Sequence, residues 1–157
     1  MKDIFTVHTG EIKIGKKDVI LKSSTIGSCV VIAAYDSKEN IGALAHVMVP
    51  GKAPKYYNYQ KTRYAEDAIE KMIILMTKSG SSPQKFDVCL AGGANVLKRK
   101  NDTIGADNIS SIIGHLKKRG IKIRAKSLGG TERRNVSLDV ENGNIYYSVG
   151  DGGEKLF

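Results

Sequence analysis

The chain has 157 residues, 41% of them hydrophobic, and 25 lysines and arginines against 16 aspartates and glutamates, a formal net charge of +9. This length and apolar content suit a single domain over residues 1–157 and exclude an intrinsically disordered chain. The longest apolar run, residues 29–35, is far shorter than the roughly 20 residues of a membrane helix, and no signal peptide is evident. With only two cysteines, we expect a soluble, reduced, cytoplasmic protein without membrane insertion.

The first fifty residues predict strands, because polar and apolar residues alternate or β-branched residues form short apolar runs. The five expected strands cover residues 5–8, 12–14, 19–21, 29–35 and 41–49. The run 29–35 is apolar throughout, which suits a strand buried on both faces. Residues 51–61 contain three tyrosines and Pro54 without a clear period, and we expect a loop there.

The middle of the chain predicts two helices separated by a strand. Apolar residues recur at three- and four-residue spacing over 65–76, and Gly80 supplies a C-terminal stop. The apolar segment 86–91 predicts a strand. A second helix is expected to begin near Asp107, which can cap it, and to end at Gly120.

The last third of the chain predicts three strands. The first covers 121–125, and the segments 136–140 and 145–149 alternate cleanly around Asn142-Gly143-Asn144, which is a strong β-hairpin signal. Neither a repeat nor a linker interrupts the chain. The sequence therefore predicts one α/β domain with about eight strands and two helices.

The positive charge is concentrated in one stretch. Residues 98–134 hold eleven basic and three acidic side chains, a local charge of +8, whereas the rest of the chain holds 14 basic and 13 acidic residues. Such an asymmetry predicts an acidic or polyanionic partner, with nucleic acid as the default candidate. The stretch contains no recognised nucleic-acid motif.

The segment 23–28 places hydroxyl residues and a glycine directly before Cys29, which opens an apolar strand. A glycine-containing turn lets several N–H groups point one way beside an exposed side chain, as a nucleophile with an oxyanion hole requires. His46 interrupts another apolar strand seventeen residues later. On adjacent strands, the imidazole of His46 can reach the sulfur of Cys29. Spacing alone, however, favours a buried core cysteine and a satisfied strand histidine.

Two other kinds of site are weaker candidates. Gly92-Gly93 follows a strand but lacks the pattern of a phosphate-binding loop, so a tight turn near the active site is favoured. A zinc site is a weak candidate because the possible ligands do not have the sequence spacing that is typical of zinc-binding motifs. The side chains that it would need are Cys29, Cys89, His8, His46 and His115.

The order of short motifs resembles the CheD family of chemoreceptor glutamine deamidases. The two most specific motifs are Ile26-Gly27-Ser28-Cys29-Val30 and the strand 42–50 that contains Ala45-His46. The match extends from about Val7 to Tyr147. It continues through Tyr64-Ala65, 91–95, 104–108, Leu128-Gly129-Gly130 with Arg133 or Arg134, and Asn142-Gly143.

The resemblance implies a sandwich of mixed β-sheet with two main helices, a cysteine-hydrolase-like deamidase fold. CheD proteins convert glutamines of chemoreceptor cytoplasmic helices to glutamates through a thioester, and some also cleave glutamate methyl esters. Carried over by position, Cys29 is the nucleophile and His46 is the general base and later the acid. As imidazolium, His46 lowers the pKa of Cys29 and protonates the departing ammonia. Ser23 stands where the family has its third catalytic residue, a threonine, and Thr25 is a nearby substitute. No metal or organic cofactor is implied.

The resemblance also implies partners. CheD proteins bind a CheC-type phosphatase, so a non-catalytic module that regulates such a phosphatase, or docks on an acidic partner, is the alternative function. Because receptor adaptation helices are rich in glutamate, the basic stretch is interpreted as a docking face for them and not for nucleic acid. Lys117, Lys118 and Arg119 are expected to contribute to receptor binding.

Overall fold

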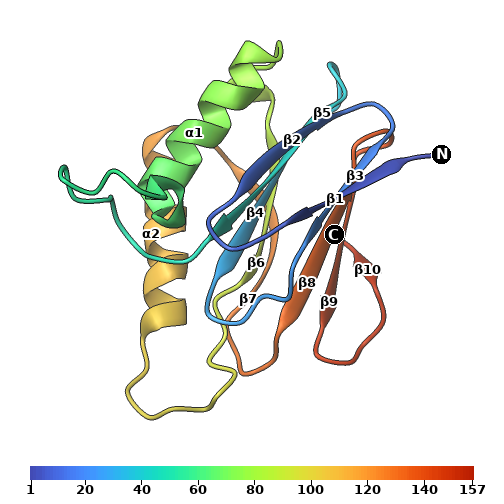
Figure 1. Ribbon diagram of the computed structural model, residues 1–157. Coiled ribbons are helices and arrows are strands. Elements are labelled where there is room, and N and C mark those ends of the chain that lie inside the picture. Colours follow the sequence, from blue (N-terminus) through green and yellow to red (C-terminus); the bar gives the residue numbers. More distant parts are fainter.

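The computed structural model describes residues 1–157 and arranges them in three layers (Figure 1). A first sheet has the strand order β2-β5-β4-β6-β7, a second sheet has the order β1-β3-β8-β9-β10, and two helices cover the outer face of the first sheet. The strands are β1 (Asp3–Val7), β2 (Ile12–Lys16), β3 (Val19–Ser23), β4 (Val30–Asp36), β5 (Ile41–Val47), β6 (Asp87–Gly92), β7 (Ile123–Leu128), β8 (Arg134–Asp139), β9 (Asn144–Val149) and β10 (Lys155–Leu156). The helices are α1 (Ala65–Lys78) and α2 (Ile104–Lys118), with 3₁₀ turns η1 (Lys61–Arg63) and η2 (Pro83–Lys85). The predicted α/β sandwich with two main helices is confirmed.

The second helix begins earlier than the sequence predicted. We expected Asp107 to cap it, but α2 starts at Ile104, so Asp107 lies in its first turn. The carboxylate of Asp102 accepts the N–H of Ile104 at 3.0 Å, and the Thr103 hydroxyl donates to Asp107 at 2.9 Å. Asp102, and not Asp107, therefore accepts an N–H group at the start of the helix. Neither helix is long and apolar enough to cross a bilayer.

The two faces of the first sheet bury two different cores. All residues of β4 and β5 are buried, and alternation along a strand sends successive side chains to opposite faces. Val30 and Ile32 belong to the cluster under the helices, whereas Val31 belongs to the cluster between the sheets. His46 pairs directly with Val31 across the antiparallel ladder, so its side chain shares the inter-sheet face.

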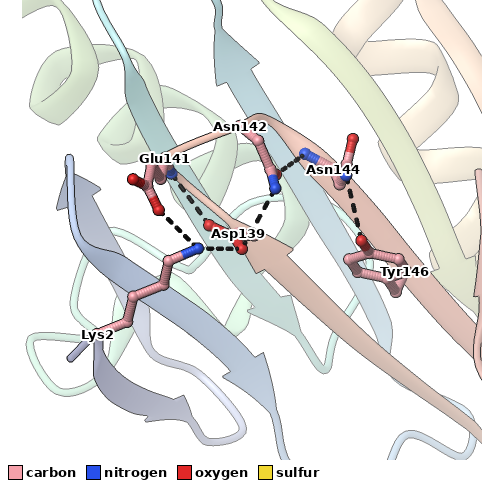
Figure 2. Close-up of polar contacts among 6 residues, drawn as sticks. All are labelled: Lys2, Asp139, Glu141, Asn142, Asn144 and Tyr146. Atoms are coloured by element: carbon pink, nitrogen blue, oxygen red, sulfur yellow. Dashed lines mark hydrogen bonds and ion pairs between the residues drawn. The ribbon is translucent and has the colours of Figure 1, made fainter.

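The N-terminal strand is held at the edge of the second sheet by ion pairs as well as by pairing with β3. The ammonium of Lys2 lies 2.7 Å from a carboxylate oxygen of Asp139 and 2.7 Å from one of Glu141 (Figure 2). The predicted hairpin turn is confirmed beside them, where the Asn144 N–H donates to the Asn142 side chain at 2.9 Å. These contacts fix β1, and β1 leads directly into the candidate site.

Candidate functional site

Cys29 lies in the turn that leads into β4, one residue before the strand begins. It is half-buried and packs against the cluster between the sheets. Because Val30 pairs with Val47 and Val31 pairs with His46, extending the ladder by one residue makes Cys29 a diagonal neighbour of His46. Side chains of diagonal neighbours on one face are within reach of each other. The fold therefore brings the two residues to one end of the inter-sheet face.

The imidazole of His46 is buried, with 1% of the residue exposed. Its Nδ1 lies 3.2 Å from the carbonyl oxygen of Val7 and 3.5 Å from the hydroxyl oxygen of Ser24. A carbonyl oxygen only accepts, so Nδ1 carries the proton and Nε2 of the neutral ring has a free lone pair. Nε2 is buried and has no hydrogen-bond partner. The β1 backbone thus sets the tautomer that a proton acceptor at Nε2 requires.

The pKa shifts at the site favour the uncharged forms. Burial raises the pKa of the Cys29 thiol above 9.0, and a hydrogen bond from the Thr9 side chain offsets only part of that shift. Burial lowers the pKa of His46 below 6.5, although its contact with the Val7 carbonyl acts in the opposite direction. At neutral pH the resting pair is therefore a thiol and a neutral imidazole. This differs from the imidazolium form expected from the sequence, because burial disfavours both charges.

The turn before β4 carries three consecutive N–H groups, those of Gly27, Ser28 and Cys29, and none of them donates to a backbone carbonyl. The carbonyl groups of Gly27 and Cys29 are both used, since they accept the N–H groups of Ala94 at 3.0 Å and Gly93 at 2.8 Å. The backbone of the turn is thus tied down through its oxygens. Its unused donors lie next to the thiol, where an oxyanion hole requires them.

Two glycines allow this close approach. Gly92 has a φ of +122°, and a Cβ there would lie 2.2 Å from the carbonyl oxygen of Cys29. A Cβ on Gly105, at the start of α2, would lie 2.4 Å from the carbonyl oxygen of Gly93. The tight turn that the sequence predicted at Gly92-Gly93 is confirmed, and it supports the cysteine turn from behind.

Asn108 on α2 is a residue of the site that the sequence reasoning did not single out. It is fully buried, and its Nδ2 donates to the carbonyl oxygens of Ser28 at 3.0 Å and Met48 at 3.1 Å. One amide thus ties the residue before Cys29 to the segment just after His46. A signal was available, because Asn108 occupies the apolar stripe of α2, four residues before the buried Ile112.

The hydroxyl residues before Cys29 have different surroundings from those expected. The hydroxyl oxygen of Ser23 accepts the N–H of Val136 at 3.0 Å, which ties β3 to β8. Thr25 is exposed to solvent. The hydroxyl that reaches the His46 ring belongs to Ser24. The structure thus places Ser24, and not the expected Ser23, beside His46.

Neither Cys29 nor His46 lines any of five cavities of about 280 to 490 Å³ in the molecule. No group of three or more histidine, cysteine or acidic side chains is placed to hold a metal ion. Of the remaining zinc candidates, Cys89 is buried in the inter-sheet core and His115 contacts Glu70 at 2.8 Å. A half-buried thiol that lines none of these cavities suits a macromolecular substrate better than a small molecule that a pocket must enclose.

A thiol beside a neutral histidine, with unused N–H groups at the same turn, has the elements of a cysteine-dependent hydrolase. The family model for CheD chemotactic sensory transduction matches residues 48–148. A protein of Chlorobium luteolum named probable chemoreceptor glutamine deamidase CheD is 37% identical over 149 residues, covering 95% of this chain and 74% of that protein. The chemoreceptor glutamine deamidase CheD of Thermotoga maritima is 32% identical over 150 residues, covering 96% of this chain and 94% of that protein. The chain belongs to the CheD family.

Proposed function

We propose that this chain is a cytoplasmic chemoreceptor glutamine deamidase, with residues 1–157 forming one catalytic domain. The substrate class comes from the names of its relatives. The observation that carries the proposal is the buried, unpartnered Nε2 of His46 on the sheet face that it shares with Cys29. Both cysteines are free thiols, in keeping with a reducing compartment.

The first half of the reaction forms a thioester. Nε2 of His46 takes the thiol proton of Cys29 as the sulfur attacks the amide carbon of a glutamine side chain. The negative oxygen of the tetrahedral intermediate accepts hydrogen bonds from the free N–H groups at 27–29. The imidazolium then gives its proton to the amide nitrogen, the C–N bond breaks, and ammonia leaves.

The second half returns the enzyme to its resting state. Neutral His46 takes a proton from water as the water oxygen attacks the thioester carbon, the C–S bond breaks, and the thiolate recovers its proton from the imidazolium. The product is a glutamate side chain, and no metal or organic cofactor enters any step. A glutamate methyl ester can follow the same route with methanol as the leaving group.

Within this proposal Ser24 takes the orienting role that the sequence assigned to Ser23. The Ser24 hydroxyl and the Val7 carbonyl both approach Nδ1 of His46, whereas the Ser23 hydroxyl is engaged with β8. Cys29 and His46 keep the roles of nucleophile and general base expected for them.

The test is mass spectrometry of a receptor cytoplasmic fragment after incubation with wild-type protein and with variants. Wild type should convert glutamines to glutamates, and Cys29→Ala and His46→Ala should not. Cys89→Ala is the matched control, because Cys89 is the other cysteine of the chain, is buried in the inter-sheet core against which Cys29 packs, and has no role in the proposed steps. Turnover by Cys29→Ala, or its loss in a folded Cys89→Ala variant, would contradict the mechanism.

We infer a CheC-type phosphatase as a second partner from family membership alone. The measurement is size-exclusion chromatography of the two proteins, mixed and separate. A complex formed equally well by Cys29→Ala would show that this binding does not need turnover, as the non-catalytic alternative requires. Two unshifted peaks at micromolar concentrations would contradict the partnership.

A further inference from the structure

A groove runs beside the cysteine turn. The loop at 93–103, between β6 and α2, lies at the same end of the molecule as the start of β4 (Figure 1). Between loop and turn is a cavity of about 280 Å³, with Gly27 and Ser28 on one side and Val96, Leu97 and Ile104 on the other. The groove therefore adjoins the residue that precedes the nucleophile.

The loop wall of the groove combines exposed apolar and unpaired basic side chains. Val96, Leu97 and Ile104 are 41%, 69% and 52% exposed. The adjoining residues 98–100 are lysine, arginine and lysine, all exposed and without an ion pair, and Asp102 is the only acid of the loop. Other arginines of the basic stretch do have acidic partners, as Arg124 has in Asp87.

The loop is held in a defined shape. The Asn95 amide brackets it, because Nδ2 donates to the Arg99 carbonyl at 2.8 Å and Oδ1 accepts the Arg99 N–H at 3.1 Å. The N–H of Asn95 itself donates to the Gly130 carbonyl at 2.9 Å. A surface that is ordered before binding loses little conformational entropy when a partner binds.

The reaction itself fixes what must cover this groove. A glutamine side chain is short, so its backbone must come close to the surface around Cys29 for the sulfur to attack. A helix with its side chains is about 10–12 Å across. A helical segment that presents a glutamine to Cys29 therefore also covers surface next to the cysteine turn, where Gly27 and Ser28 begin the groove.

We propose that the loop at 93–103, together with Ile104 at the start of α2, is the docking surface for an acidic, amphipathic helical segment that carries the substrate glutamine. This inference rests on the proposed function. Val96, Leu97 and Ile104 take the apolar face of the segment, and the basic residues 98–100 take its carboxylates. Each turnover also creates a new carboxylate, so a segment with several target glutamines becomes more complementary to this loop as it is modified.

Lys117, Lys118 and Arg119, which were also expected from the sequence to bind the receptor, lie farther from the cysteine turn than this loop. Along the ladders of β6, Gly92 pairs with Val30, beside the nucleophile, and Val88 pairs with Ile123. Four residues of strand separate the two ends by about 13 Å. The helix end at 117–119 lies near the Ile123 end, where Lys117 and Ile123 line one cavity. The acidic residues Glu66, Asp67 and Glu70 also lie beside Lys118 and Arg119.

The test compares two triple charge reversals of equal size. The loop variant is Lys98→Glu with Arg99→Glu and Lys100→Glu, and the control is Lys117→Glu with Lys118→Glu and Lys122→Glu at the other end of the sheet. Deamidation is measured against receptor-fragment concentration. The loop variant should raise KM about tenfold or more with kcat retained, less so at high salt, and the control should change KM less than about twofold. Leu97→Ser should also raise KM.

Alkylation of Cys29 by iodoacetamide is measured in every variant, and should proceed at the wild-type rate if the thiol site is intact. An unchanged KM in the loop variant, or an equal rise in both charge variants, would overturn the docking inference. Failure of the wild type to convert any receptor glutamine would instead contradict the proposed function, so the two failures are distinguishable.

Discussion

The side-chain amide of Asn108 donates a hydrogen bond to the carbonyl oxygen of Ser28 at 3.0 Å, across 80 residues of sequence. The same nitrogen donates to Met48 at 3.1 Å. The first contact holds the turn of the nucleophile and the second holds the strand end that follows His46. A residue on a helix thereby sets the relative position of two groups on neighbouring strands.

Asn108→Ala should lower kcat more than it changes KM, because it releases both segments without touching the docking loop. Leaving two carbonyl groups unpaired should also cost about 1–3 kcal/mol in the free energy of unfolding. Asn108→Asp should cost more at neutral pH, since a carboxylate cannot donate to either carbonyl. Ser110→Ala, at an exposed position of α2, is the control for kinetics and denaturant unfolding. Wild-type kcat in a folded Asn108→Ala variant would remove Asn108 from the site.

Ser23→Ala and Ser24→Ala should separate a structural hydroxyl from one that orients the catalytic histidine. Ser23→Ala deprives the Val136 N–H of its acceptor, so it should lower the free energy of unfolding by about 1 kcal/mol with kcat retained. Ser24→Ala removes the hydroxyl 3.5 Å from Nδ1 of His46 and should lower kcat several-fold with little loss of stability. The opposite pattern would return the orienting role to Ser23.

Gly92→Ala and Gly114→Ala should have effects of opposite sign on stability. A Cβ at Gly92 meets the Cys29 carbonyl oxygen at 2.2 Å in a backbone with φ of +122°. Strain of this kind costs about 1–3 kcal/mol or more, and it should reduce kcat as well because the cysteine turn must move. Gly114 lies in mid-helix with nothing within 4 Å of a Cβ, so alanine should stabilise by about 1 kcal/mol with activity unchanged. Thermal unfolding and deamidation assays on both variants check this.

The pH dependence of Cys29 alkylation should report a thiol and not a resting thiolate. Because burial raises the pKa of Cys29, the alkylation rate should be very low at neutral pH and should still be rising with pH in the alkaline range. Because burial lowers the pKa of His46, kcat/KM should fall only at pH values more acidic than the usual range of histidine titration, where the ring takes a proton and no longer acts as the base. Fast alkylation that persists down to pH 6 would indicate a thiolate–imidazolium pair instead.

Much of the fold could be predicted from the sequence because it follows from local patterns. The apolar run at 29–35 and the hairpin at Asn142-Gly143 became β4 and the turn between β8 and β9. Several boundaries moved: α2 begins at Ile104, where Asp102 accepts its first N–H group, Cys29 lies just outside its strand, and β7 covers Ile123–Leu128 where 121–125 was predicted. The two-residue β10 carries too short a pattern to be predicted.

By itself the sequence determined the class of fold and the family resemblance, and it led to the proposal of Cys29 and His46 as the residues for the chemistry, since those inferences depend on residue types in a fixed order. Only the tertiary structure decided which hydroxyl approaches His46, which tautomer the ring adopts, and that Asn108 ties the two segments together. It also showed that Arg99 lines the cavity beside Gly27 and Ser28, whereas Lys117 lines a different cavity. Hydrogen bonds and charge proximity depend on distances across the fold, and side chains on neighbouring positions of a strand point to opposite faces.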